Sequence, residues 1–201
     1  MRGPATIFPS MLPLRLGLAA ALMVSLVRAA APVPSAAATN APAVSDPEKR
    51  KYELPVPPDE NVAYGPHRMQ VIYFWRARSD RPTPLLFYIH GGGWNGGDRS
   101  VVRNMLVPAL QAGISVASVE YRTIRDATAD GVIPPVRAPM LDCARALQFC
   151  RSKAAEWNLD KTRIAAAGGS AGACTSLWLA FHDDLADPLS PDPVARERSE
   201  E

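Results

Sequence analysis

Residues 165–174 read AAAGGSAGAC and contain the pattern G-x-S-x-G, with Gly168, Ser170 and Gly172 at its fixed positions. A serine in this pattern is typical of a nucleophile on a strained strand-to-helix turn, where its neighbours must have almost no side chain. The helix that follows points its N-terminal N–H groups at developing negative charge. A phosphate-binding turn or a simple tight corner would use the same glycines, so this pattern alone leaves those interpretations open.

A second glycine-rich segment favours the nucleophile. Residues 90–94 read HGGGW and end an apolar run, LLFYIH, at 85–90. Successive glycines leave backbone N–H groups free to face an oxyanion, and such a run accompanies a nucleophilic serine in ester-cleaving enzymes. Two such segments, each after a predicted strand, coincide by chance far less often than one. We therefore interpret Ser170 as a nucleophile.

Together with VEYR at 119–122, the segments HGGGW and GGSAG make the sequence resemble the α/β-hydrolase superfamily. Within it, the sequence is similar to the hormone-sensitive-lipase-like and feruloyl-esterase-like carboxylesterases. The resemblance covers about residues 60 to 190. It implies a serine ester hydrolase whose substrate is a small-molecule or polysaccharide-linked ester, such as an acyl or feruloyl ester.

The resemblance also assigns roles to individual residues. Ser170 would attack the ester carbonyl and carry the acyl group until water hydrolyses it, with no metal or cofactor. One donor of an oxyanion hole contributes about 3 kcal/mol to transition-state stabilisation. The expected donors are the backbone N–H groups of Gly92, Gly93 and Ala171. Structural support is expected from His90, Gly91, Gly168 and Gly172.

A nucleophilic serine also needs a base, and we find no suitable residue for this role in the sequence. The family orders its triad as serine, acid and histidine, so the base should follow Ser170. Of the three histidines only His182 does, and a helix from residue 171 would place it ~17 Å along the axis from Ser170. Proton transfer needs ~3 Å. Asp183 and Asp184 fail in the same way, and His67 is expected at the surface.

We therefore predict that the chain lacks the triad acid and histidine and represents the N-terminal part of a larger hydrolase, with negligible triad-type turnover by itself. Two other functions remain open. A serine peptidase of the prolyl-oligopeptidase type shares the serine turn, although HGGGW favours the esterase. A non-catalytic remnant that folds poorly or binds a partner would also explain the absent base.

The elements that must position these segments can be read from periodicity and from turn residues. Alternating strands and helices predict an α/β-hydrolase fold, with a mostly parallel sheet and helices on both faces, truncated after the nucleophile helix. Four or five of the family's eight strands are expected. The expected strands are 68–77, 85–90, 114–122 and 162–169. The expected helices are 100–113, kinked or shortened by Pro108, then 140–157 and 170–184, with a long loop at 123–138.

The N-terminal region has a different composition. Residues 1–29 combine arginines with a short apolar run and small residues at the end, which predicts a cleaved signal peptide and a secreted or periplasmic protein. A short membrane anchor is the alternative. Residues 30–60 are rich in proline and alanine and predict a flexible leader, so the partial hydrolase domain is expected at 61–201.

Cleavage would remove Arg2, Arg15 and Arg28 and leave 19 basic against 20 acidic residues, with no basic surface for nucleic acid. It would also leave no stable membrane insertion. The sequence leaves the oligomeric state open. We expect Cys143, Cys150 and Cys174 to be small buried hydrophobic residues.

Overall fold

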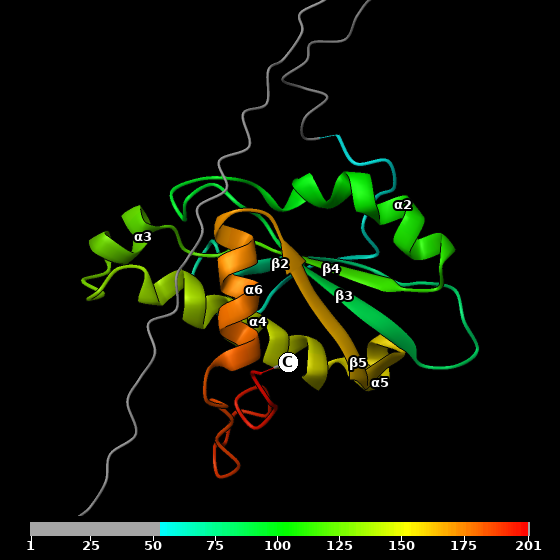
Figure 1. Cartoon of the computed structure of the whole chain (residues 1–201). Helices are drawn as coiled ribbons and strands as arrows, with labels where there is room; N and C mark the ends of the chain where they lie inside the picture. The colour runs from blue at the N-terminus through cyan, green and yellow to red at the C-terminus, as the bar shows by residue number, and fades with distance from the viewer. Residues whose placement is uncertain (1–52, 201) are drawn as a thin grey trace, which may run out of the picture. The chain divides into compact units, whose positions relative to one another are not determined.

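A five-stranded sheet in the order β1-β2-β4-β3-β5 organises residues 53–200, which are the residues that the structure, a computed structural model, describes (Figure 1). The predicted signal peptide and most of the predicted leader lie outside this range. All four predicted strands are present. A fifth strand, β1, precedes them. It was not predicted, because the polar segment ENVA has no alternating apolar pattern. The strands are β1 (Glu60–Ala63), β2 (Val71–Trp75), β3 (Thr83–Ile89), β4 (Ser115–Val119) and β5 (Leu159–Gly168).

The sheet is mixed. Strand β3 pairs in parallel with β4 on one side and with β5 on the other. Strands β1 and β2 and strands β2 and β4 pair antiparallel. A short connection joins β1 to β2 and allows antiparallel pairing, whereas helices connect β3, β4 and β5, as parallel strands require. The expected parallel arrangement therefore holds for the three strands from which the candidate site is built.

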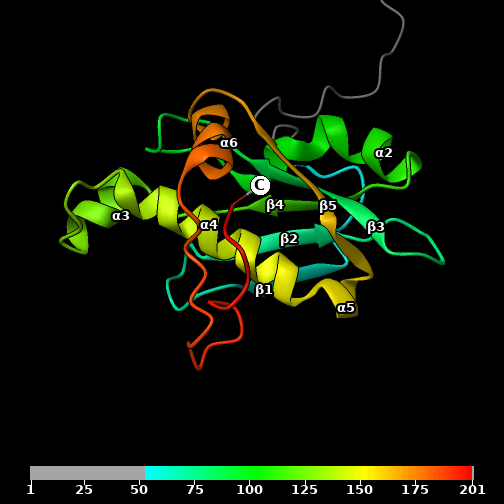
Figure 2. The same ribbon diagram turned by 60° about the horizontal axis from the view of Figure 1, so that its bottom comes forward.

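Helices cover both faces of the sheet, as predicted. Figures 1 and 2 show α2 on one face and α4 and α6 on the other. The helix expected at 100–113 is split into a 3₁₀ turn and α2, which runs through Pro108 and ends just before Gly113 (φ +75°). None of the helices within residues 53–200 is long and apolar enough to cross a membrane. The helices are η1 (Arg99–Val102), α2 (Arg103–Gln111), α3 (Ile124–Ala129), α4 (Arg137–Ser152), α5 (Ala154–Trp157) and α6 (Ala171–Phe181).

The prediction of a long loop at 123–138 is wrong for its first part, because this part contains the helix α3. Thr123 caps this helix by accepting a hydrogen bond from the Asp126 N–H, and the Asp126 carboxylate accepts one from the Thr123 N–H. This capping box satisfies two backbone donors at the helix start, so even a six-residue helix is held in place. The T-x-x-D spacing was the available signal.

Apolar side chains form one cluster on each face of the sheet. The smaller cluster lies under α2 and includes Trp75, Leu106 and Val116. The larger one lies under α4, α5 and α6, where the Phe74 and Trp157 rings stack with centroids 4.0 Å apart. Cys143 and Cys150 are buried in this larger cluster, as predicted. Cys174 is exposed on α6, and the expectation that it is buried is wrong, because the face of α6 that carries it packs on nothing in the described part of the chain.

Candidate active site

Ser170 lies on the turn between β5 and α6, as the G-x-S-x-G pattern predicts. Its backbone has φ 53° and ψ −120°, and the residue is exposed. A non-glycine residue with positive φ is strained, and such strain is concentrated at functional sites, where the surrounding structure enforces it. Helix α6 starts directly after Ser170, at Ala171, so the N–H groups of its first turn lie beside the serine.

Contacts with the end of β3 enforce this turn. A Cβ atom on either Gly168 or Gly172 would overlap the carbonyl oxygen of Ile89, the last residue of β3. Glycine is therefore the residue that allows β5 and the first turn of α6 to approach β3 so closely. Their role in supporting the active site stays a prediction.

The HGGGW segment follows β3 and lies against the serine turn. A Cβ atom on Gly91 would be 2.6 Å from the Gly169 oxygen and 3.4 Å from the Ser170 Cβ atom. Gly92 and Gly93 have φ values of 118° and 60°, which suit glycine. Two segments about 80 residues apart thus meet at one edge of the sheet, as parallel strands in this fold require.

Three backbone N–H groups at this junction remain available. Within residues 53–200, the N–H groups of Gly92, Gly93 and Ala171 donate to no protein acceptor. They belong to the loop after β3 and to the first residue of α6, the two segments that the sequence predicted as sources of an oxyanion hole. Their role as oxyanion donors stays a prediction.

His90 anchors the glycine loop from below. Its imidazole is fully buried, with Nε2 2.8 Å from Glu120 Oε1 and Nδ1 2.8 Å from the Gly91 oxygen. The Tyr121 hydroxyl donates a hydrogen bond to the His90 carbonyl oxygen (2.7 Å), and the two rings stack with centroids 4.2 Å apart. Burial, with smaller contributions from Cys143 and Glu120, raises the pKa of Tyr121, so its hydroxyl keeps the proton that it donates.

Sequence reasoning identified His90 as structural but did not assign roles to Glu120 and Tyr121. Both follow β4 directly and belong to the VEYR segment. The available signal was their polarity at the end of an apolar strand, because a buried polar side chain must find a partner. The same segment continues with Arg122, whose backbone and side chain both donate hydrogen bonds to Asp142.

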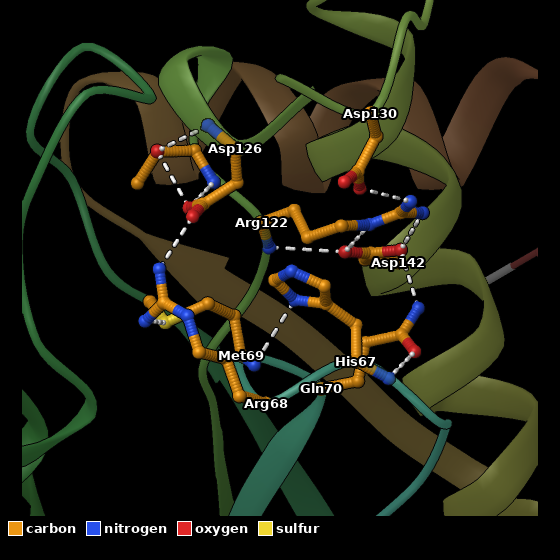
Figure 3. A network of polar contacts seen from close by, with 9 residues as sticks. His67, Arg68, Met69, Gln70, Arg122, Asp126, Asp130 and Asp142 are labelled. Atoms are coloured by element: carbon orange, nitrogen blue, oxygen red, sulfur yellow. Dashed lines mark hydrogen bonds and ion pairs between the residues drawn. The ribbon is translucent and has the colours of Figure 1, made fainter. Parts of the chain in front are cut away.

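A polar network joins Arg122 to α4 and to the turn between β1 and β2 (Figure 3). Asp142 of α4 accepts hydrogen bonds from Arg122 Nε (3.0 Å), Nη2 (2.7 Å) and backbone N–H (2.9 Å), and from Gln70 Nε2 (2.8 Å). The hydrogen bonds and negative charge of Asp142 raise the pKa of Arg122 despite its partial burial. Asp130 adds a weaker contact, 3.3 Å from Arg122 Nη1. The network fixes the backbone that leads away from Glu120 and Tyr121.

Each of the three histidines has its ring engaged by residues other than Ser170. His90 has both ring nitrogens engaged. His67 lies in the turn between β1 and β2, and its Nδ1 accepts the Met69 N–H (3.1 Å). His182 lies at the opposite end of α6 from Ser170, with its ring stacked on Trp178 and Nε2 3.3 Å from Ser199 Oγ. Both expectations, a surface position for His67 and a distant one for His182, agree with the structure.

Residues 53–200 contain no group of three or more His, Cys, Asp or Glu side chains placed to hold a metal ion. An apolar groove of about 690 Å³ does exist, between α2 and strands β3 and β5. Ser170 and the HGGGW segment are not among the residues that line it, so it is separate from the candidate active site.

The strand order, the strained serine after β5 and the glycine loop after β3 define an α/β-hydrolase fold. The family described as BD-FAE matches residues 72–190, which is more than half of the chain. The protein therefore belongs to this family of feruloyl-esterase-like α/β hydrolases. The matched range runs from β2 to beyond the end of α6 and contains both glycine segments.

Individual relatives agree with this placement. The chain is 33% identical over 117 residues to Esterase LipC of Mycobacterium tuberculosis, a match that covers 55% of this chain and 27% of LipC. An acetyl ester-xyloside bifunctional hydrolase from Caldicellulosiruptor lactoaceticus superimposes with a TM-score of 0.61 at 22% identity, covering 73% of this chain and 55% of that chain. Propionate-bound esterase 2 of Thermogutta terrifontis gives a TM-score of 0.58 at 22% identity, with coverages of 70% and 51%. The chain thus spans about a quarter of LipC and about half of these solved structures.

Proposed function

We propose that this chain is the N-terminal part of a serine carboxylic-ester hydrolase that acts by acylation of Ser170. The observation that carries the proposal is the contact between the HGGGW loop and the strained Ser170 turn, with three N–H groups left free at the junction. Family membership supports it, as does the similarity to proteins named as esterases. The substrate would be a small-molecule or polysaccharide-linked ester.

In the proposed reaction, Ser170 Oγ attacks the carbonyl carbon of the ester while a base removes its proton. The electron pair of the carbonyl moves to oxygen, and the N–H groups of Gly92, Gly93 and Ala171 stabilise that oxyanion. The oxyanion then collapses and the bond to the leaving oxygen breaks; that oxygen takes the proton back from the base and departs as the alcohol, which leaves an acyl group on Ser170. Water hydrolyses this acyl-enzyme in a second attack of the same kind.

In our proposal this chain does not supply the base. The rings of His67, His90 and His182 are each engaged by residues other than Ser170. The chain alone would then be acylated slowly and turn over negligibly. A small diffusible base should replace the missing histidine in part. This gives a direct test that uses the full chain.

The test is acetylation by 4-nitrophenyl acetate with and without added imidazole, followed by mass spectrometry of the acetylated peptides. We expect imidazole to accelerate acetylation of Ser170 well beyond that of Ser79, an exposed serine far from the site in sequence. Ser170→Ala should lose this reaction. Equal acetylation of Ser170 and Ser79 would contradict the proposal and favour a non-catalytic remnant.

Two further outcomes refine the proposal. Fast multiple turnover without imidazole that disappears in Ser170→Ala would show that the chain does hold a base. Acylation by esters but not by 4-nitroanilides would separate an esterase from a prolyl-oligopeptidase-type peptidase.

The proposed secretion rests on residues 1–29 and has its own test, the N-terminal sequence of protein recovered from the culture medium or the periplasm. Cleavage after Ala29 is expected.

A further inference from the structure

Trp94, the last residue of HGGGW, adopts an unusual backbone conformation. Its φ is 56°, in the left-handed region, which bulky side chains rarely occupy. Gly93 before it has φ 60°, and the Asn95 N–H donates to the Gly92 oxygen (3.0 Å), so residues 92–95 form a closed turn with both central residues at positive φ. A glycine at position 94 would adopt this turn without strain. The tryptophan must therefore be held there by contacts elsewhere.

Those contacts lead to the nucleophile helix and to α3. The indole Nε1–H of Trp94 donates to Thr175 Oγ1 in α6 (3.0 Å), and the Ile124 N–H at the start of α3 donates to the Trp94 oxygen (2.7 Å). Half-buried Trp94 also packs against the larger apolar cluster. Helix α3 thus fixes the backbone of the turn, and helix α6 fixes the Trp94 side chain.

Thr175 continues the connection toward the serine turn. Its side chain is fully buried, and its hydroxyl donates to the Ala171 oxygen (2.9 Å) while it accepts from Trp94. Ala171 is also the residue whose N–H is expected to face the oxyanion, next to Ser170. A chain of two hydrogen bonds therefore links the two segments that supply the expected oxyanion donors. One end is the turn with Gly92 and Gly93, and the other is the first residue of α6.

We propose that Trp94 and Thr175 are positioning residues, whose indole–hydroxyl hydrogen bond sets the distance between the two halves of the oxyanion hole. This inference rests on the proposed acylation of Ser170. In the structure, the side-chain hydrogen bonds of Trp94 and Thr175 go to each other and to the Ala171 oxygen. Their effect comes from geometry, since oxyanion donors stabilise the transition state only when they lie within hydrogen-bond distance of the developing charge.

Two variants remove the hydrogen bond with little change in shape. Trp94→Phe keeps an aromatic ring and removes the donor, and Thr175→Val keeps the volume and removes the hydroxyl. Each should slow imidazole-dependent acetylation of Ser170 about tenfold at saturating ester, because small misplacements of this kind have large effects on rate. The ester concentration for half-maximal rate should change little. Thr175→Val removes the bond from Trp94 together with the bond to the Ala171 oxygen, so the double variant should be no slower than Thr175→Val alone.

The chain offers matched controls for both changes. Ser176 donates to the Gly172 oxygen (2.9 Å), as Thr175 does to Ala171, but the Trp94 indole donates to Thr175. Trp178 lies on the same helix near His182. Ser176→Ala and Trp178→Phe should therefore acetylate within about twofold of the original chain, and Thr175→Ser should retain the rate because it keeps the hydroxyl.

A second measurement does not depend on acylation. In ¹⁵N-resolved NMR spectra, Thr175→Val should shift the amide resonances of Gly92, Gly93 and Ala171, whereas Ser176→Ala should leave those of Gly92 and Gly93 in place. Unchanged Gly92 and Gly93 resonances in Thr175→Val, or unchanged acetylation in Trp94→Phe, would overturn the positioning role. If Ser170 of the unaltered chain is not acetylated, the proposed function fails, and the NMR comparison still decides whether the bond positions the loop.

Discussion

The two strands that flank β3 differ in how completely they are paired and buried. On the β4 side, which comprises β1, β2 and β4, strand β4 is paired along both edges and all five of its residues are buried. On the β5 side, which comprises β5 and α6, strand β5 pairs only with β3 within the described residues. Several of its residues are exposed, although its second half, IAAAG, is as apolar as a buried strand.

The same contrast appears in the side chains around each strand. The β4 side ends in the Arg122–Asp142 network, in which buried polar groups satisfy one another. The β5 side leaves Leu177 and Phe181 of α6 62% and 83% exposed, and the apolar groove under α2 reaches the face of β5. An apolar strand with an open edge promotes aggregation. We infer that polar pairing holds the β4 side, while the β5 side depends on one face of α6 and on its contact with β3.

The largest effect should come from the β4 side. Asp142→Ala leaves the Arg122 guanidinium and the Gln70 amide without their buried partner, and we expect a loss of about 4 kcal/mol in the free energy of unfolding. Asp130→Ala is the matched control, because Asp130 also pairs with Arg122 but is 38% exposed and should contribute less than about 1 kcal/mol. Urea unfolding of both variants measures the difference. Equal losses would show that burial does not distinguish the two carboxylates.

Two leucines of α6 test the other side. Leu179 is fully buried, and Leu177, two residues earlier, is 62% exposed. Leu179→Ala should lower the free energy of unfolding by about 3 kcal/mol, because it leaves a cavity in the larger cluster. Leu177→Ala should change it by less than about 0.5 kcal/mol. A large loss for Leu177→Ala would mean that this face of α6 is covered in solution and that the β5 side is not open.

The close contact between the start of α6 and the end of β3 can be tested through the glycines beside Ser170. Gly172→Ala forces a Cβ atom against the Ile89 oxygen and should cost about 2 kcal/mol of stability, with loss of Ser170 acetylation as the turn is displaced. Gly169 has open space where a Cβ would be, so Gly169→Ala should stay within about 0.5 kcal/mol. Thermal unfolding followed by circular dichroism provides the comparison. A neutral Gly172→Ala would show that α6 is not held closely against β3.

The smallest effect concerns acid pH at the end of the β5 side. Burial alone would raise the pKa of Asp184, but hydrogen bonds from the Ser199 and Ala186 N–H groups lower it below its usual value overall. A lowered folded-state pKa gives stability that is present above the unfolded-state value and is lost as pH falls through the folded-state value. The stability difference between the original chain and Asp184→Asn should therefore shrink as pH is lowered from 5 toward 2. Asp183→Asn is the control, and a difference that does not depend on pH would exclude this carboxylate as the source.

Much of the fold could be predicted because its signals are local. The apolar run before HGGGW and the strand before Ser170 depend on residues close in sequence, and both strands are found within a few residues of the predicted bounds. The single helix expected at 140–157 is found as two helices, α4 and α5. Strand β1 was missed because its pairing with β2, rather than its own polarity pattern, makes it a strand. The exposure of Cys174 was missed for a similar reason. An apolar helix sequence does not say how many of its faces will be covered.

The sequence by itself determined that Ser170 lies on a strand-to-helix turn, with glycines on either side of it and a glycine loop beside it, because glycine and the G-x-S-x-G spacing constrain the backbone locally. It also determined the position of His182, since a helix of that length separates it from Ser170. Only the tertiary structure decided how these parts are held together. The His90–Glu120 and Trp94–Thr175 contacts join residues 30 and 81 positions apart, and no local pattern specifies which buried polar groups will meet. That choice depends on the parallel order of β4, β3 and β5, which brings their carboxyl ends to one edge of the sheet.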